Sequence, residues 1–94
     1  MGNDALLKYV NLIQEFLSKR IDAATFEASY LTMFKNETVA FGGATFEILD
    51  GVFNDVDAFC QNPALRGPND LDEDQLRDVC RSALKRLEPL IIAS

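Results

Sequence analysis

The chain has 94 residues, of which 48% are hydrophobic, and it contains no histidine. Its 15 acidic and nine basic residues give a net charge of −6 at pH 7. This hydrophobic content excludes a disordered chain, and the length suits one domain, so we expect residues 1–94 to form a single domain. An acidic protein is repelled by nucleic acids and anionic membranes and attracted to basic surfaces, so we expect no nucleic-acid or membrane partner.

Residues 4–18 carry apolar side chains at helical spacing and predict a first amphipathic helix, with Asp4 as a candidate cap. The pattern breaks at residues 18–20, and Asp22 follows as an N-cap beside a hydrophobic staple. A second helix is therefore expected to end near residues 35–36. The short turn between the two predicts an antiparallel hairpin.

A third helix is expected after the glycine pair at residues 42–43, with Thr45 or a neighbour at its start. It is predicted to run to about Gln61, because Pro63 stops it. Its apolar residues share one half of the helix circumference. They are Phe46, Ile48, Leu49, Val52, Phe53, Val56, Phe59 and Cys60.

The segment 71–76 combines a capping box with a hydrophobic staple and predicts a fourth helix that starts at Asp72. Pro89 disfavours helical backbone at the residue before it, so this helix is expected to end there. The predicted fold is all-α, an antiparallel four-helix bundle, because four amphipathic helices with short connections pack best in that way.

The sequence offers little for catalysis or for a cofactor. Cys60 and Cys80 fall on apolar helix faces, which predicts buried free thiols, and without histidine they make no ordinary zinc site. Asp70, Asp72 and Asp74 have calcium-loop spacing, but the glycine and the final glutamate of that motif are missing. We expect no enzyme activity, no metal and no cofactor.

The amino terminus lacks a basic start followed by an apolar run, so no secretory signal is predicted. The longest apolar runs of the chain are far shorter than the roughly 20 residues that a membrane-spanning helix needs. These features predict a cytoplasmic protein.

The excess negative charge lies in one segment. Residues 44–78 hold nine acidic and two basic residues, whereas residues 1–43 hold five and four and residues 79–94 hold one and three. On the third helix, Glu47, Asp50 and Asp57 lie within about 80° of one another, and Asp55 lies to one side. A solvated helix face is the alternative interpretation.

Two observations favour a binding surface over a solvated face. Asp55 and Asp57 lie in the C-terminal half of the helix, where the helix dipole disfavours negative charge. No basic residue occurs between Lys35 and Arg66 to neutralise the stripe. The acidic residues at 70–74 are more ambiguous, since negative charge at a helix start also favours capping.

Three segments resemble a known family. They are LIQEFLSKRIDAATFE at residues 12–27, Val52-Phe53 followed by Asp57 and Phe59, and LDEDQLR at residues 71–77. In this order and spacing the chain resembles the colicin-like bacterial self-protective immunity proteins, a family that includes the colicin D immunity protein and immunity proteins of contact-dependent growth inhibition.

The resemblance implies a non-catalytic four-helix inhibitor, monomeric when free, that binds one copy of the C-terminal nuclease domain of a toxin. The family's toxins include tRNA anticodon-loop nucleases, whose basic active sites the inhibitor covers with carboxylates. By position Asp57 matches the central acidic residue, and the loop at residues 62–74 is expected to set which toxin is recognised. The expected toxin-binding residues are Glu47, Asp50, Asp55, Asp57, Asp70, Asp72, Glu73 and Asp74.

From the residues alone, a second function stays open. An acidic helical adaptor or regulatory scaffold would bind a basic peptide or protein without inhibiting a nuclease.

Overall fold

The structure is a computed structural model that describes residues 2–38, 40–60, 64–65, 67 and 70–92. Within these residues it contains four helices and no strand: α1 (Gly2–Leu17), α2 (Ala23–Lys35), α3 (Gly43–Asp57) and α4 (Glu73–Ile92). The predicted all-α four-helix fold is confirmed.

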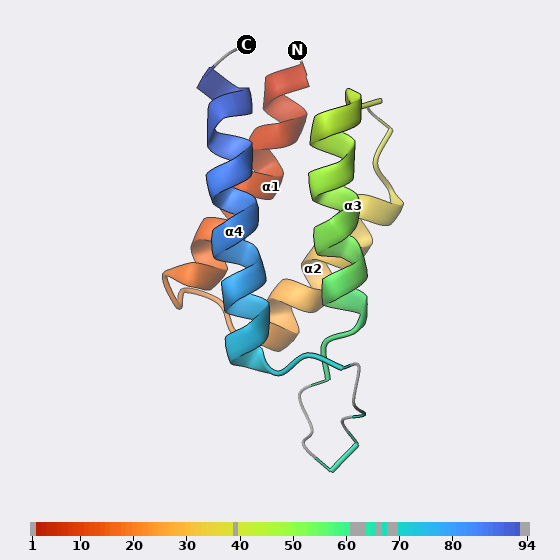
Figure 1. Cartoon of the computed structure of the whole chain (residues 1–94), viewed down its shortest axis with the longest axis vertical. Helices are drawn as coiled ribbons and strands as arrows, with labels where there is room; N and C mark the ends of the chain where they lie inside the picture. The colour runs from red at the N-terminus through yellow and green to blue at the C-terminus, as the bar shows by residue number, and fades with distance from the viewer. Residues whose placement is uncertain (1, 39, 61–63, 66, 68–69, 93–94) are drawn as a thin grey trace.

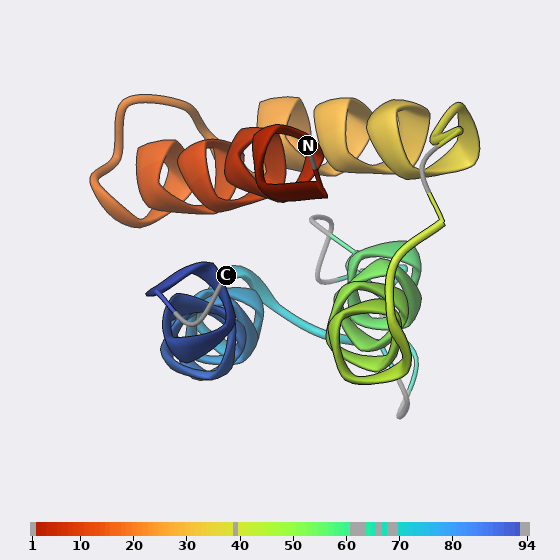
Figure 2. The same ribbon diagram turned by 90° about the horizontal axis from the view of Figure 1, so that it is seen from above.

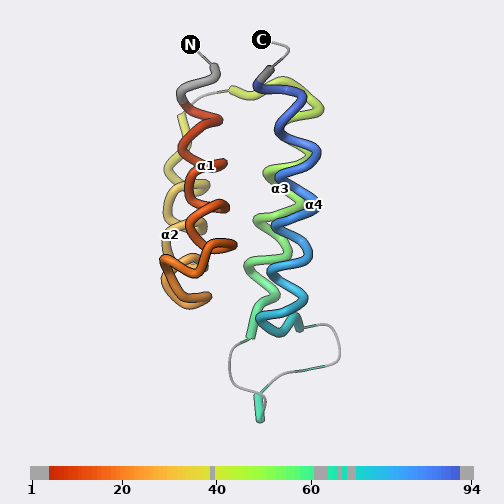
Figure 3. The backbone as a smooth tube through the Cα atoms, turned by 90° about the vertical axis from the view of Figure 1, so that its left-hand side faces the viewer, coloured from red at the N-terminus to blue at the C-terminus, as the bar shows by residue number. Residues whose placement is uncertain are grey.

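The helices form two layers, with α1 and α2 in one and α3 and α4 in the other (Figures 1, 2 and 3). Successive helices run in opposite directions, and the α1–α2 layer crosses the other obliquely (Figures 1 and 2). Each helix packs against its two neighbours in the ring α1–α2–α3–α4. The α2–α3 interface therefore lies on the side of the bundle opposite the α1–α4 interface (Figure 2).

Aromatic side chains from α1 and α2 fill the centre of the core. Phe16 and Phe26 stack with their ring centroids 4.6 Å apart, and Tyr30 contacts both Phe26 and Tyr9. All four side chains are fully buried. The hydroxyl of Tyr30 donates a 2.8 Å hydrogen bond to the carbonyl of Leu49, which joins α2 to α3.

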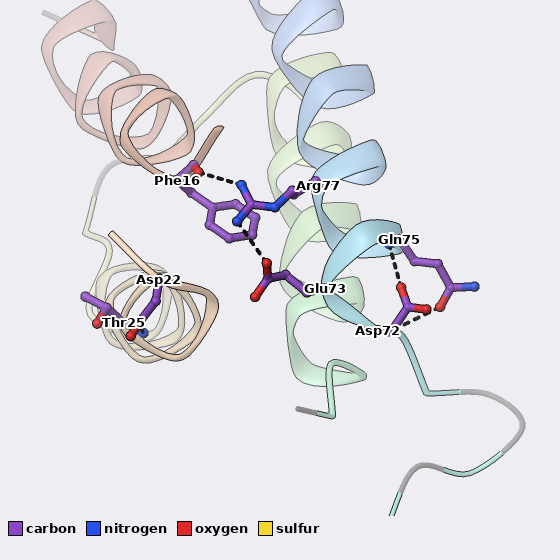
Figure 4. A network of polar contacts seen from close by, with 7 residues as sticks. All are labelled: Phe16, Asp22, Thr25, Asp72, Glu73, Gln75 and Arg77. Carbon is purple, nitrogen blue, oxygen red and sulfur yellow. Dashed lines mark hydrogen bonds and ion pairs between the residues drawn. The ribbon is translucent and has the colours of Figure 1, made fainter. Parts of the chain in front are cut away.

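Local capping starts two of the helices as the sequence predicts. The carboxylate of Asp22 accepts a 2.8 Å hydrogen bond from the Thr25 N–H at the start of α2 (Figure 4). Before α4, the Gln75 N–H donates to Asp72 and the Asp72 N–H donates to Gln75, which completes the capping box (Figure 4). These bonds use N–H groups that have no partner inside the helix.

Arg77 joins the start of α4 to the end of α1. Its guanidinium lies 4.5 Å above the centroid of the Phe16 ring and donates a 3.0 Å hydrogen bond to the Phe16 carbonyl (Figure 4). The same group pairs with Glu73 at 3.0 Å. One arginine thus stacks on an aromatic ring while it binds a carboxylate.

Two helices begin slightly earlier than predicted. Because α1 begins at Gly2, Asp4 lies within its first turn and is not a cap. Because α3 begins at Gly43, Thr45 also lies inside the first turn, and Gly42 is the N-cap, without a side-chain hydrogen bond. A glycine N-cap has no side chain with which to accept a hydrogen bond from the first N–H groups of α3.

The predicted end of α3 near Gln61 is also wrong, because the helix ends at Asp57. Beyond it, the Cys60 N–H donates to the Leu71 carbonyl and the Leu71 N–H donates to the Ala58 carbonyl, both at 3.0 Å. This pairing replaces a further helical turn, and it brings the start of α4 beside the end of α3. Gln61 itself lies outside the described residues.

Helix α4 continues through Pro89, contrary to the prediction that it ends there. Pro89 is exposed, while Leu90 and Ile91 pack against the core. Proline removes one helical hydrogen bond. Burial of the two apolar side chains that follow offsets this loss.

Neither cysteine forms a disulfide, as predicted; Cys80 is fully buried, whereas Cys60 is only half-buried, contrary to the predicted burial. Burial raises the pKa of Cys80 to about 12, so this thiol stays protonated near neutral pH.

The Asp72→Ala substitution removes one half of the capping box, and we expect it to lower the free energy of unfolding by about 1 kcal/mol. Asp74→Ala, two residues further on, removes an exposed carboxylate and is expected to cost only a few tenths of a kcal/mol. Urea denaturation measures both values, and equal losses would contradict the capping role of Asp72.

The Tyr30→Phe substitution keeps the buried ring and removes the hydrogen bond between α2 and α3. We expect a loss of about 1 kcal/mol in the free energy of unfolding, because the replacement ring has no donor for the Leu49 carbonyl. Thermal unfolding monitored by circular dichroism provides the measurement. A variant as stable as the wild type would show that this bond contributes nothing net.

Candidate functional site

Three of the predicted acidic residues share the outer side of α3. Glu47 and Asp57 are exposed, and Asp50 is half-buried. Among the described residues, no lysine or arginine forms an ion pair with any of the three; the ion pairs found there are Lys8–Glu37, Arg77–Glu73 and Arg81–Asp78. Within the described residues, the three carboxylates of the predicted stripe therefore have no cationic partner.

Asp55 points toward α4 instead. It lines a hollow of about 180 Å³ between α3 and α4, together with Gly51 on its own helix and Ser82 and Arg86 on α4. Partial burial raises the pKa of the Asp55 carboxyl above its ordinary value. Asp55 thus lies on a different side of α3 from Asp50 and Asp57.

Most of the acidic residues at 70–74 have structural partners. Asp70 accepts a 2.9 Å hydrogen bond from the Gly67 N–H, Asp72 caps α4, and Glu73 pairs with Arg77. Asp74 is exposed and has no ion pair among the described residues. Of the predicted variable loop at 62–74, residues 62–63, 66 and 68–69 lie outside the described part.

Aromatic side chains lie beside the α3 carboxylates. Phe46 is 48% exposed, although its helical position placed it in the predicted core. Its ring centroid lies 6.2 Å from that of Phe34 on α2, and Phe34 lies 5.0 Å from Phe53 on α3. Phe34 and Phe53 are half-buried. The three rings form a continuous apolar strip across the α2–α3 interface.

Glu27 on α2 adds a carboxylate at the far end of this strip. Burial, and then repulsion from the neighbouring Asp57 carboxylate, raise the pKa of Glu27. Glu27 has no ion pair in the described part of the chain. We call the surface formed by Glu27, Phe34, Phe46, Asp50, Phe53 and Asp57 the α2–α3 face.

Sequence reasoning missed Glu27, Phe34 and the exposure of Phe46. A partial signal is present in the sequence, because Phe46, Asp50, Phe53 and Asp57 are spaced by four, three and four residues, which places them along one line of a helix. The nearness of Glu27 to Asp57 has no such signal, since it depends on how α2 packs against α3.

Other candidate sites are weaker. In the described residues, no three histidine, cysteine, aspartate or glutamate side chains are grouped to hold a metal ion. None of the helices in the described residues is both long and apolar enough to span a membrane. A second hollow, at the end of α1, is lined by polar side chains that include Gln14 and Arg20.

Comparison with known proteins gives one result. The family described as bacterial self-protective colicin-like immunity matches residues 5–87. This range covers parts of all four helices and the whole α2–α3 face. No curated protein and no solved structure matches the chain.

The Asp57→Asn substitution tests the contact between the two carboxylates. We expect the pKa of Glu27 to fall, because the neighbouring negative charge is removed, and to remain above its ordinary value, because burial is the larger cause of the shift. Carbon-detected NMR titration of the Glu27 carboxyl gives the value. Glu47→Gln is the control. If Asp57→Asn leaves the pKa of Glu27 unchanged, the carboxylates of Glu27 and Asp57 do not interact.

Proposed function

Because the chain belongs to the family of bacterial self-protective colicin-like immunity proteins, we propose that it inhibits the C-terminal nuclease domain of a cognate toxin by covering its basic active site. Membership of this family makes it a self-protective toxin inhibitor. The family match is the observation that carries the proposal. The proposal includes a nuclease target, a 1:1 complex and inhibition in the cytoplasm.

The charge distribution supports a nuclease as the target. A nuclease that cuts RNA, such as a tRNase, binds phosphate groups and therefore has a basic active site. The carboxylates of Glu47, Asp50 and Asp57 lack cationic partners in the described part of the chain, so they are available to bind lysine and arginine of a partner. They would occupy the active site in place of RNA phosphates.

Asp57 has the central role in this proposal, with Asp50 and Glu47 in support. Asp55 and Asp74 are secondary candidates, because Asp55 faces the α3–α4 hollow and Asp74 lies at the start of α4. Asp70, Asp72 and Glu73 already bind groups of their own chain, so binding a toxin would require them to accept further donors.

We expect Asp57→Lys to weaken binding to the toxin nuclease domain encoded by the neighbouring gene by at least about tenfold, because it replaces attraction with repulsion. The wild type should silence RNA cleavage at about one molecule per toxin. Calorimetry gives the Kd and stoichiometry, and an RNA cleavage assay gives the inhibition.

Glu15→Lys is the matched control, because it makes the same change in net charge at an exposed residue of α1. Its effect should be small and should disappear at high salt. Tight binding with undiminished RNA cleavage would refute active-site occlusion. If the wild type does not bind the nuclease domain, the proposed target is wrong.

A further inference from the structure

The α2–α3 face combines aromatic side chains with carboxylates on one surface. Single exposed apolar residues are common in monomeric proteins. Here the half-exposed ring of Phe46 continues into Phe34 and Phe53, and carboxylates flank the strip of rings. Asp50 and Asp57 each follow a phenylalanine of α3 by four residues, and Glu27 approaches Asp57 from α2.

The chemistry of this face selects its occupant. A second copy of this chain would bring its own carboxylates and a net charge of −6 to the same surface, so it would be repelled. Nucleic acid and anionic lipid would be repelled for the same reason. A basic protein satisfies the carboxylates, but a lysine supplies only a compact charge, whereas an arginine also supplies a plane that stacks on aromatic rings.

The molecule already contains the corresponding arrangement in its own fold. Arg77 lies 4.5 Å above the Phe16 ring and binds Glu73 at 3.0 Å, so that one guanidinium contacts a ring and a carboxylate together. On the α2–α3 face, the pairs Phe46–Asp50 and Phe53–Asp57 present a ring and a carboxylate from adjacent turns of α3. No arginine of the described residues forms an ion pair with them.

We propose that the α2–α3 face is a docking surface for arginine side chains of a basic protein partner. The guanidinium planes stack on the rings of Phe46 and Phe53, while their N–H groups bind Asp50, Asp57 and Glu27. This inference rests on the proposed function, since it names the residue type by which the same surface recognises the toxin domain. It adds aromatic stacking to charge as a source of affinity.

Two substitutions of Phe46 separate stacking from simple apolar contact. We expect Phe46→Ala and Phe46→Leu each to raise the Kd for the toxin nuclease domain by about tenfold or more, because both remove the aromatic face. Leu7→Ala is the control, since Leu7 is also an exposed apolar residue, at 37%, but lies on α1. Since Phe46 is exposed, thermal unfolding should show that the variants stay folded.

Substitutions in the partner identify the arginine that stacks on Phe46. Each arginine of the toxin domain is replaced by lysine, and binding is measured against the wild type and against Phe46→Ala. We expect one Arg→Lys substitution that weakens binding to the wild type and has little further effect in the Phe46→Ala background. Such a coupling is what direct contact between two side chains produces.

The outcomes distinguish this inference from the proposed function. If Phe46→Leu binds as tightly as the wild type while Phe46→Ala binds weakly, the contact is apolar and arginine stacking is refuted. If Asp57→Lys weakens binding and neither Phe46 substitution does, the docking inference is wrong and inhibition through the α3 carboxylates stands. If the wild type does not bind the toxin domain, both are wrong.

Discussion

The hydroxyl of Tyr30 donates a 2.8 Å hydrogen bond to the carbonyl of Leu49 across the α2–α3 interface, from a side chain with no exposure to solvent. The ring of Tyr30 also contacts Phe26 and Phe34 on its own helix and Tyr9 on α1. A buried hydroxyl without a partner is costly, so this bond fixes how α2 lies against α3. The relative positions of Glu27, Phe34 and the α3 residues depend on it.

The acidic residues of this chain divide into two groups by their surroundings. Asp22, Asp72 and Glu73 bind N–H groups or an arginine of the same chain, and they stabilise helix starts or the packing of α4 on α1. The carboxylates of α3 have no cationic partner in the described residues. The same residue type therefore serves the fold in one place and remains available for a partner in another.

The second group works against the stability of the fold. Asp57 is the last residue of α3, where the helix dipole disfavours negative charge, and its carboxylate adds to burial, the larger cause, in raising the pKa of Glu27. A group with a raised pKa in the folded state contributes stability below its unfolded pKa and loses it as the pH rises through the folded pKa. Near neutral pH, Glu27 is therefore destabilising in the free protein, and a cationic partner would relieve that repulsion.

The amino-acid sequence alone determined the features that depend on neighbouring residues. Asp22 and Asp72 cap helices because each carboxylate accepts a hydrogen bond from an N–H group only three residues further along the chain. The family resemblance was also readable from three short segments, and the family match confirms it. The uneven distribution of acidic residues along the chain is also visible in the sequence itself.

Tertiary structure decided the features that depend on contacts between distant segments. The end of α3 is set by the pairing of Ala58 and Cys60 with Leu71, and α4 passes Pro89 because Leu90 and Ile91 have a core to pack against. Helical spacing placed Phe46 on the apolar side of α3. Its exposure depends on how α2 packs against α3, because Phe34 of α2 contacts the Phe46 ring without covering it. The same packing brings Glu27 beside Asp57 and leaves Asp55 facing α4, because the register of two helices depends on buried side chains far apart in the sequence.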